Sequence, residues 1–229
     1  MSALIEGEHK VRPYINRMLK MKRLFLLFLV ISFIFTINAF AQEAFPKKKP
    51  TASAGKAIYD KQCITCHGAS GNGKGPVSGS LNPKPTDFTD HVQMRLKSPA
   101  ELYNITRKGK PPMPSYTNMK DDDLWNVIFY VVSFSSTKDM AAKGKEIYFR
   151  DCAFCHGKTG AGDGPGGASL PLKTRNFADI KWMAEQKDGA LYQNMAMGIP
   201  TSGIACAAKL KPEERWNVLS YIRAFTYSN

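Results

Sequence analysis

The sequence predicts an all-α protein with two tandem units that follow an N-terminal signal peptide. Apolar residues recur at helical spacing, and no segment shows the strict alternation of polar and apolar residues that is typical of a strand. Many residues downstream of residue 52 recur with an offset of 89 positions, so the second half of the chain duplicates the first. We therefore expect residues 52–136 and 137–229 to form two similar domains.

Each unit is expected to contain a helix that leads into a short cysteine motif, a loop rich in Gly and Pro, and two further helices. The first helices are predicted over about 54–62 and 138–150, and the loops over 68–85 and 157–172. Gly55 and Gly144 lie within the first helices. Because they lack a side chain, a second helix can approach closely there.

The remaining helices have recognisable ends. Ser98 and Glu101 form a capping box, and Gly109 closes the helix that they start. Asp121 is expected to cap the last helix of the first unit. Pro212 begins the equivalent helix of the second unit, where proline is favoured at the first helical position.

Residues 1–41 have the three parts of a secretory signal peptide. A basic segment ending at Arg23 precedes an apolar run over 24–37, and a small-x-small site ends at Ala41. The run of 14 residues is short for a membrane span, which needs roughly 20. Either cleavage follows Ala41, or residues 24–37 remain as a membrane anchor. Both alternatives place the folded part in an exported, periplasmic or equivalent, compartment.

The residues on either side of the signal peptide's basic and apolar parts carry two further predictions. Residues 1–17 are polar and lie upstream of the basic segment, so translation could begin at Met18 or Met21 instead of Met1. After the cleavage site, residues 42–51 combine three lysines with flanking prolines and are expected to form an exposed linker.

Two copies of C-x-x-C-H carry the chemistry, at Cys63–His67 and Cys152–His156. In such a motif the two thiols add to the two vinyl groups of one haem, and the adjacent histidine binds its iron. Neither motif has further Cys or His nearby at the spacing of a zinc site, and neither lies in the βαβ context of a thiol redox pair. We therefore expect two covalent haem c groups. The attachment residues are Cys63, Cys66, Cys152 and Cys155, and the proximal ligands are His67 and His156.

The surroundings of the motifs also repeat. A last helix with W-x-x-x-x-Y follows each motif, at Trp125–Tyr130 and Trp216–Tyr221. Together with Met113-Pro114 between motif and helix, this arrangement resembles the class I cytochrome c family over about residues 52–229. The resemblance implies a small all-α fold around each haem and, in tandem members, relay of electrons between two haems. It also implies that Met113 is the distal ligand of the first iron.

The second unit departs from this pattern. Two residues are inserted between Gly198 and Trp216, where the offset changes from 89 to 91. The position equivalent to Met113 is therefore Ser202 or Ile204, and neither side chain can replace a thioether ligand. The sequence leaves three candidates open for the sixth ligand, namely Met195, Met197 and the fifth cysteine, Cys206. A five-coordinate or water-bound iron is the further alternative. His91 has no counterpart in the repeat and is expected on the surface.

The chain is basic, with 32 Lys and Arg against 19 Asp and Glu, and residues 42–229 alone carry a net charge of +9. Such an excess favours steering toward a redox partner with an acidic docking surface, or toward an anionic membrane face. No stripe of basic residues is interleaved with exposed aromatic residues, which argues against nucleic acid.

These observations favour a periplasmic single-electron carrier over an enzyme. Two alternatives remain. One is a di-haem redox enzyme, similar to thiosulfate dehydrogenases or peroxidases, that uses the second haem. The other is a cytochrome subunit of a respiratory complex, tethered by residues 24–37.

Overall fold

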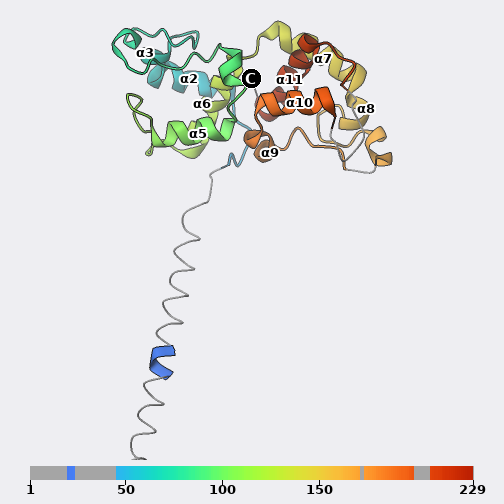
Figure 1. The fold of residues 1–229 in the computed structure, drawn as a ribbon, viewed down its shortest axis with the longest axis horizontal. Coiled ribbons are helices and arrows are strands. Elements are labelled where there is room, and N and C mark those ends of the chain that lie inside the picture. Colours follow the sequence, from blue (N-terminus) through green and yellow to red (C-terminus); the bar gives the residue numbers. More distant parts are fainter. Residues whose placement is uncertain (1–19, 24–44, 171–172, 199–206, 229) are drawn as a thin grey trace, which may run out of the picture. The chain divides into compact units, whose positions relative to one another are not determined.

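The computed structural model describes residues 20–23, 45–170, 173–198 and 207–228, and the chain divides into two compact units, Met1–Ala44 and Phe45–Asn229 (Figure 1). Within the described residues, helices, turns and isolated bridges make up the secondary structure. The prediction of an all-α fold is confirmed. The apolar run over 24–37 lies outside the described residues. None of the helices in the described ranges has both the length and the apolar character that crossing a membrane requires.

The first half of the larger unit contains five α-helices and one 3-10 turn among its described residues. They are α2 (Ala52–Gln62), α3 (Ile64–His67), η1 (Ser78–Ser80), α4 (His91–Met94), α5 (Pro99–Lys108) and α6 (Asp121–Ser133). The capping box is present, because Ser98 Oγ accepts from the Glu101 amide at 3.1 Å and Glu101 accepts from the Ser98 amide at 2.8 Å. Gly109 follows α5 with φ +75°, as the sequence predicts.

The second half repeats this order. Its elements are α7 (Lys138–Asp151), α8 (Ala153–His156), η2 (Pro165–Ser169), α9 (Ile180–Glu185), α10 (Asp188–Met197), α11 (Pro212–Arg223) and η3 (Ala224–Thr226). The two motif-bearing turns are α3 and α8, and each directly follows the long helix that precedes it. The duplication in the sequence therefore corresponds to a duplication of helices.

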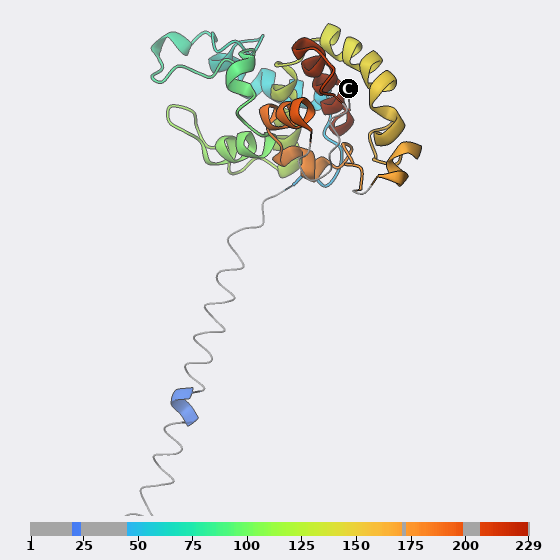
Figure 2. The same cartoon turned by 45° about the vertical axis from the view of Figure 1, so that its right-hand side comes forward.

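In each half the first and last helices cross at a glycine. α2 packs against α6, and α7 against α11, whose red ribbon lies beside the yellow α7 in both ribbon views (Figures 1 and 2). A Cβ atom on Gly55 would lie 2.1 Å from the carbonyl oxygen of Asn126, and one on Gly144 would lie 1.8 Å from that of Asn217. The predicted close approach is confirmed at both crossings.

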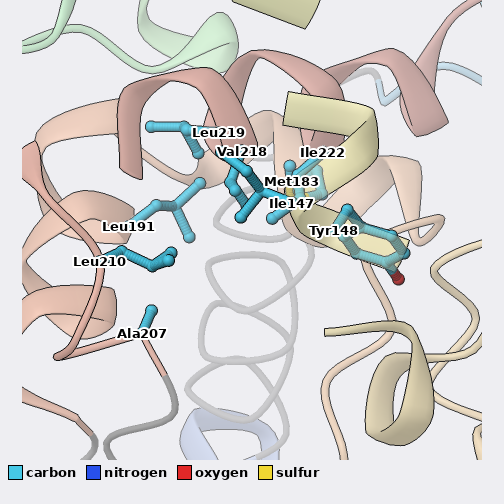
Figure 3. Packing of buried hydrophobic residues seen from close by; sticks show 9 residues of the cluster. All are labelled: Ile147, Tyr148, Met183, Leu191, Ala207, Leu210, Val218, Leu219 and Ile222. Carbon is cyan, nitrogen blue, oxygen red and sulfur yellow. The ribbon is translucent and has the colours of Figure 1, made fainter. Parts of the chain in front are cut away.

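The core of the second half surrounds the crossing of α7 and α11. Its buried residues converge from α7, α9, α10 and α11 and from the segment before α11 (Figure 3). They are Ile147, Tyr148, Met183, Leu191, Ala207, Leu210, Val218, Leu219 and Ile222. Tyr148, Met183 and Val218 are completely buried. These side chains fix α7, which continues into the second motif.

Asp121 is not a cap, contrary to the sequence prediction. The N-cap of α6 is Lys120, and Asp121 is the first helical residue. Its carboxylate accepts a hydrogen bond from the hydroxyl of Tyr103 at 2.6 Å and pairs with Arg107. Because α5 supplies both partners, a tertiary contact replaces the expected local one.

The residues expected as an exposed linker are only partly exposed. Lys47–Lys49 face solvent, but Pro50 is buried and the ring of Phe45 stacks on Trp125 with centroids 6.4 Å apart. Ser228, the residue before the last, pairs with this segment, since its amide donates to the carbonyl of Pro50 and its carbonyl accepts from the amide of Ala52, at 2.8 and 2.7 Å. Both ends of the larger unit are thus held at the start of α2.

Candidate haem sites

Each C-x-x-C-H motif forms one helical turn. After α2, Cys63 takes φ −118° and ψ −31°, and the amides of Cys66 and His67 then donate to its carbonyl at 3.2 and 2.9 Å. In the second motif, the carbonyl of Cys152 accepts the equivalent two bonds at 3.1 and 2.9 Å. Both thiols of a motif therefore leave the same turn, with the histidine directly after the second thiol, as attachment to one porphyrin edge requires.

The orientation of both histidines is fixed by their Nδ1 atoms. Nδ1 of His67 lies 3.2 Å from the carbonyl oxygen of Thr86, and Nδ1 of His156 lies 3.0 Å from that of Arg175. A carbonyl can only accept, so Nδ1 carries the proton and the lone pair of Nε2 is available for iron. Phe88 and Phe177 stack on the two imidazoles, with centroids 4.5 and 4.3 Å apart.

The electrostatics of both histidines favour the neutral imidazole that a metal ligand needs. Burial lowers the pKa of His67 and of His156, and the hydrogen bond to the backbone carbonyl opposes this effect only in part. A neutral imidazole binds iron through a ring nitrogen, whereas an imidazolium has no lone pair to offer. The electrostatics of both sites thus favour iron binding.

Glycines let the following loop lie directly on each motif turn. A Cβ atom on Gly75 would lie 2.3 Å from the carbonyl oxygen of Thr65, and one on Gly164 would lie 2.4 Å from that of Phe154. Gly68 and Gly157 follow the histidines with φ +77° each, and the hydroxyls of Tyr59 and Tyr148 donate to their carbonyls at 2.8 and 2.7 Å. The proximal side is therefore built identically in both halves.

The structure does not favour the alternatives to haem. Burial, with a smaller contribution from Cys66, raises the pKa of Cys63 to about 11. A thiol redox pair instead depends on a lowered thiol pKa. For zinc, residues 45–170, 173–198 and 207–228 contain no group of three or more His, Cys, Asp or Glu side chains that could hold a metal ion. The motif turns and the oriented histidines fit covalent haem.

Met113 lies on a tight turn after α5. The amide of Lys110 donates to the carbonyl of Met113 at 3.1 Å, and the amide of Met113 donates back to Lys110 at 2.8 Å. The Met113 side chain is half-buried. The segment thus presents a methionine from a defined turn between α5 and α6, and its role as distal ligand remains a prediction.

The candidate ligands of the second iron have different surroundings. Met195 is half-buried and packs against the core cluster of the second half, whereas Met197 is 71% exposed. Cys206 lies outside the described residues. His91, expected on the surface, is half-buried beside Arg95 and Trp216 in a small cleft.

Several residues of the sites are not identifiable from the sequence. Thr86 and Arg175 hold the histidines through their backbone carbonyls, so their side chains carry no signal. Phe88 and Phe177 were detectable only as a matched pair in the repeat, without an assigned role. Arg107 binds the segment after Met113 through backbone carbonyls, and no local pattern predicts such a contact.

Two family models match the chain. The model described as cytochrome c oxidase, cbb3-type, subunit III matches residues 50–131, and the model described as cytochrome c matches residues 141–226. A chain of the solved reducing HAO-like protein complex of Kuenenia stuttgartiensis shares 24% identity, over 80% of this chain and 99% of its own length, with a TM-score of 0.35.

Three curated relatives illustrate the similarity. The cbb3-type cytochrome c oxidase subunit FixP of Bradyrhizobium diazoefficiens is 27% identical over 157 residues, which covers 63% of this chain and 50% of the relative. The cytochrome bc1 complex cytochrome c subunit of Corynebacterium diphtheriae is 26% identical over 191 residues, or 74% and 65% of the two chains. The subunit CcoP of Azospirillum sp. is 30% identical over 149 residues, or 55% and 47%.

The chain spans about half to two thirds of the length of these relatives. The two model matches fall on the two halves that the repeat and the helices define, and each contains one complete C-x-x-C-H turn. The chain therefore belongs to the cytochrome c family, with two cytochrome c domains in tandem and two covalently bound haem c groups.

Proposed function

We propose that the protein is an exported single-electron carrier that relays electrons between a donor protein and a respiratory membrane complex. The observation that carries this proposal is the matched pair of histidines, each with Nδ1 held by a backbone carbonyl and Nε2 available for iron. When bound, each haem iron supplies a one-electron ferric/ferrous couple. The residues of the chain keep the proximal ligands neutral and fixed, so little reorganisation accompanies a change of charge.

In this proposal Met113 is the distal ligand of the first iron. A thioether is neutral and soft, so it favours the ferrous state and raises the reduction potential. The second domain has Ser202 or Ile204 at this position. Its distal ligand is Met195, Met197, Cys206 or water, or its iron is five-coordinate. With Cys206 or water in place of a methionine, the second haem has the lower potential, and electrons pass from the second haem to the first.

We predict that Met113→Ala lowers one of the two reduction potentials by roughly 0.1–0.2 V, within the range of about 0.8 V that axial ligands span. The haem content stays at two per chain, because attachment depends on the cysteines. Potentiometric titration followed by absorbance measures the shift. Met119→Ala, which removes a methionine six positions further along the same segment, is the matched control and leaves both potentials unchanged. Two unshifted potentials in Met113→Ala would exclude Met113 as a ligand.

The relatives favour a second form of the same function, a cytochrome subunit built into the complex itself. They include subunits of cbb3-type cytochrome c oxidase and of the cytochrome bc1 complex. Retention of residues 24–37 as an anchor would support this form. Mass spectrometry of the native protein distinguishes the two, since a soluble chain that begins at Gln42 contradicts the tethered subunit.

EPR spectroscopy of the ferric protein tests the enzymatic alternative. Two low-spin spectra of His/Met type would remove the reason for proposing an open or thiolate-bound second iron. A high-spin or thiolate-type spectrum that changes in Cys206→Ala would support a catalytic second haem.

The basic charge supports an acidic docking partner. Residues 42–229 carry a net charge of +9 before the haem propionates are counted. We predict that reduction by the native donor slows about tenfold when the ionic strength rises from about 0.01 M to about 0.15 M, because salt screens the attraction. Stopped-flow kinetics measure the rate, and an uncharged small-molecule reductant is the control. If the rate of reduction by the native donor did not change with ionic strength, this would contradict electrostatic steering.

A further inference from the structure

Residues 109–120, here called the Met113 loop, are held by the side chain of Arg107 in the last turn of α5. Nη1 of Arg107 donates to the carbonyls of Tyr116 and Thr117 at 2.8 and 3.1 Å, and also to that of Met119. Nη2 donates to the hydroxyl of Tyr103 at 2.8 Å and pairs with Asp121. The guanidinium therefore binds the loop and is itself held by α5 and α6.

Tyr116 joins the same loop to the haem-attachment side. Its hydroxyl donates to the carbonyl of Gln62, the residue before Cys63, at 3.0 Å. Its amide donates to the carbonyls of Thr106 and Arg107 at 3.2 Å each. One residue of the loop thus contacts both the end of α5 and the beginning of the first C-x-x-C-H motif.

The second domain has neither of these side chains. The offset of 89 residues places Ala196 at the position of Arg107, and the position of Tyr116 corresponds to Ala205 or, with the offset of 91 that holds at Trp216, to Ala207. Arg215 of α11 takes up part of the role, since its Nε and Nη2 donate to the carbonyls of Ala207 and Ala208 at 3.2 and 2.9 Å. Among the described residues of the equivalent segment, these contacts lie at its end, next to α11.

We propose that Arg107 and Tyr116 are positioning residues that hold Met113 at the sixth position of the first haem iron. The inference rests on the proposed role of Met113 as distal ligand. A methionine in the same chain competes with other ligands through its effective concentration at the iron, and this concentration falls when the loop that carries it is free to move. The second domain has no methionine at the position equivalent to Met113, and neither arginine nor tyrosine at the positions equivalent to Arg107 and Tyr116.

Imidazole titration of the ferric full-length holoprotein tests the inference. The readout is the charge-transfer band of methionine-bound ferric haem, which disappears when imidazole displaces the thioether. Tyr116→Phe removes one hydrogen bond, and we expect it to strengthen imidazole binding at the first haem about tenfold. Arg107→Gln removes several hydrogen bonds and is expected to strengthen it further. Haem content remains at two per chain in both variants.

Arg215→Gln is the matched control, because it removes an arginine that binds backbone carbonyls at the equivalent segment of the other domain. It leaves imidazole binding at the first haem unchanged, even if it lowers the thermal midpoint of unfolding. Unchanged imidazole affinity in Tyr116→Phe would overturn the inference, and this variant decides the matter if Arg107→Gln fails to fold.

Met113→Ala tests separately whether Met113 is the distal ligand, which is the assignment on which the positioning role depends. A charge-transfer band as strong in Met113→Ala as in the wild type would show that Met113 does not bind the first iron, and both proposals would fail. Any band from Met195 or Met197 at the second iron is the same in both proteins. Weakening or loss of the band in Met113→Ala, with wild-type imidazole affinity in Tyr116→Phe, would leave Met113 as ligand and overturn only the positioning role.

Discussion

At the scale of single residues, Tyr59 and Tyr148 connect the packing of the helices with the geometry of the motifs. Both side chains are completely buried, and their hydroxyls satisfy the carbonyls of Gly68 and Gly157 at 2.8 and 2.7 Å. Each glycine directly follows a proximal histidine. A buried carbonyl without a donor costs more than a hydrogen bond contributes, so these hydroxyls are expected to be important for stability.

We predict that Tyr148→Phe destabilises the second domain by about 1–3 kcal/mol, because the carbonyl of Gly157 loses its donor. Urea unfolding of the holoprotein, followed by circular dichroism, measures the change. Tyr221→Phe is the control, since its ring lies 5.4 Å from that of Tyr148 and its hydroxyl has no hydrogen-bond partner among the described residues. It is expected to change stability by less than about 0.5 kcal/mol. Equal effects of both substitutions would contradict the prediction.

At the scale of elements, the crossings of first and last helices determine where the motif turns lie. α7 meets α11 at Gly144, and its C-terminal end continues into the turn of the second motif. A displaced α7 would therefore move Cys152 and the residues after it. The same relation holds for α2, α6 and the first motif, where Gly55 faces the carbonyl of Asn126.

Gly144→Ala tests this crossing, and the sign of its effect is informative. Helix propensity alone would make the alanine variant more stable by about 1 kcal/mol. The added Cβ would lie 1.8 Å from the carbonyl oxygen of Asn217, so the helices must separate. We expect a net loss of about 1–3 kcal/mol in denaturant unfolding. Gly79→Ala is the control, because no atom lies within 4 Å of its Cβ position, and it is expected to cause no loss. A stabilised Gly144→Ala variant would contradict the close crossing.

The helices and motif turns were predictable because their signals are local. The capping box at Ser98, the glycine after α5 and the proline at the start of α11 each act within one or two turns. Asp121 was predicted wrongly because its partners, Tyr103 and Arg107, lie 18 and 14 residues away. The support of the Met113 loop is also non-local, since the contacts of Arg107 span 9 to 12 residues and that of Tyr116 with Gln62 spans 54.

At the scale of the larger unit, the two domains are joined by contacts that the repeat does not contain. Arg95 of the first domain lies over the ring of Trp216 in the second, with Cζ 3.4 Å from the ring centroid, and its carbonyl accepts from Gly189 at 3.0 Å. Lys187 and Glu101 form an ion pair at 2.9 Å across the same boundary. With the offset of 89, the residue of the second domain that is equivalent to Arg95 is Ala184. The repeat therefore predicts two domains but not the contact between them.

We predict that Arg95→Ala loosens the arrangement of the two domains without unfolding either. A cation over a desolvated aromatic ring contributes about 0.5–2 kcal/mol, and Arg95 supplies it between domains. Dipolar EPR between the two ferric irons should then show a broader distribution of distances, while both haem spectra stay unchanged. Arg175→Ala is the control, since Arg175 lies over Trp182 within the second domain, at 4.5 Å. Its distance distribution should match that of the wild type. An equally narrow distribution in Arg95→Ala would mean that the ion pair and the C-terminal contacts hold the domains without it.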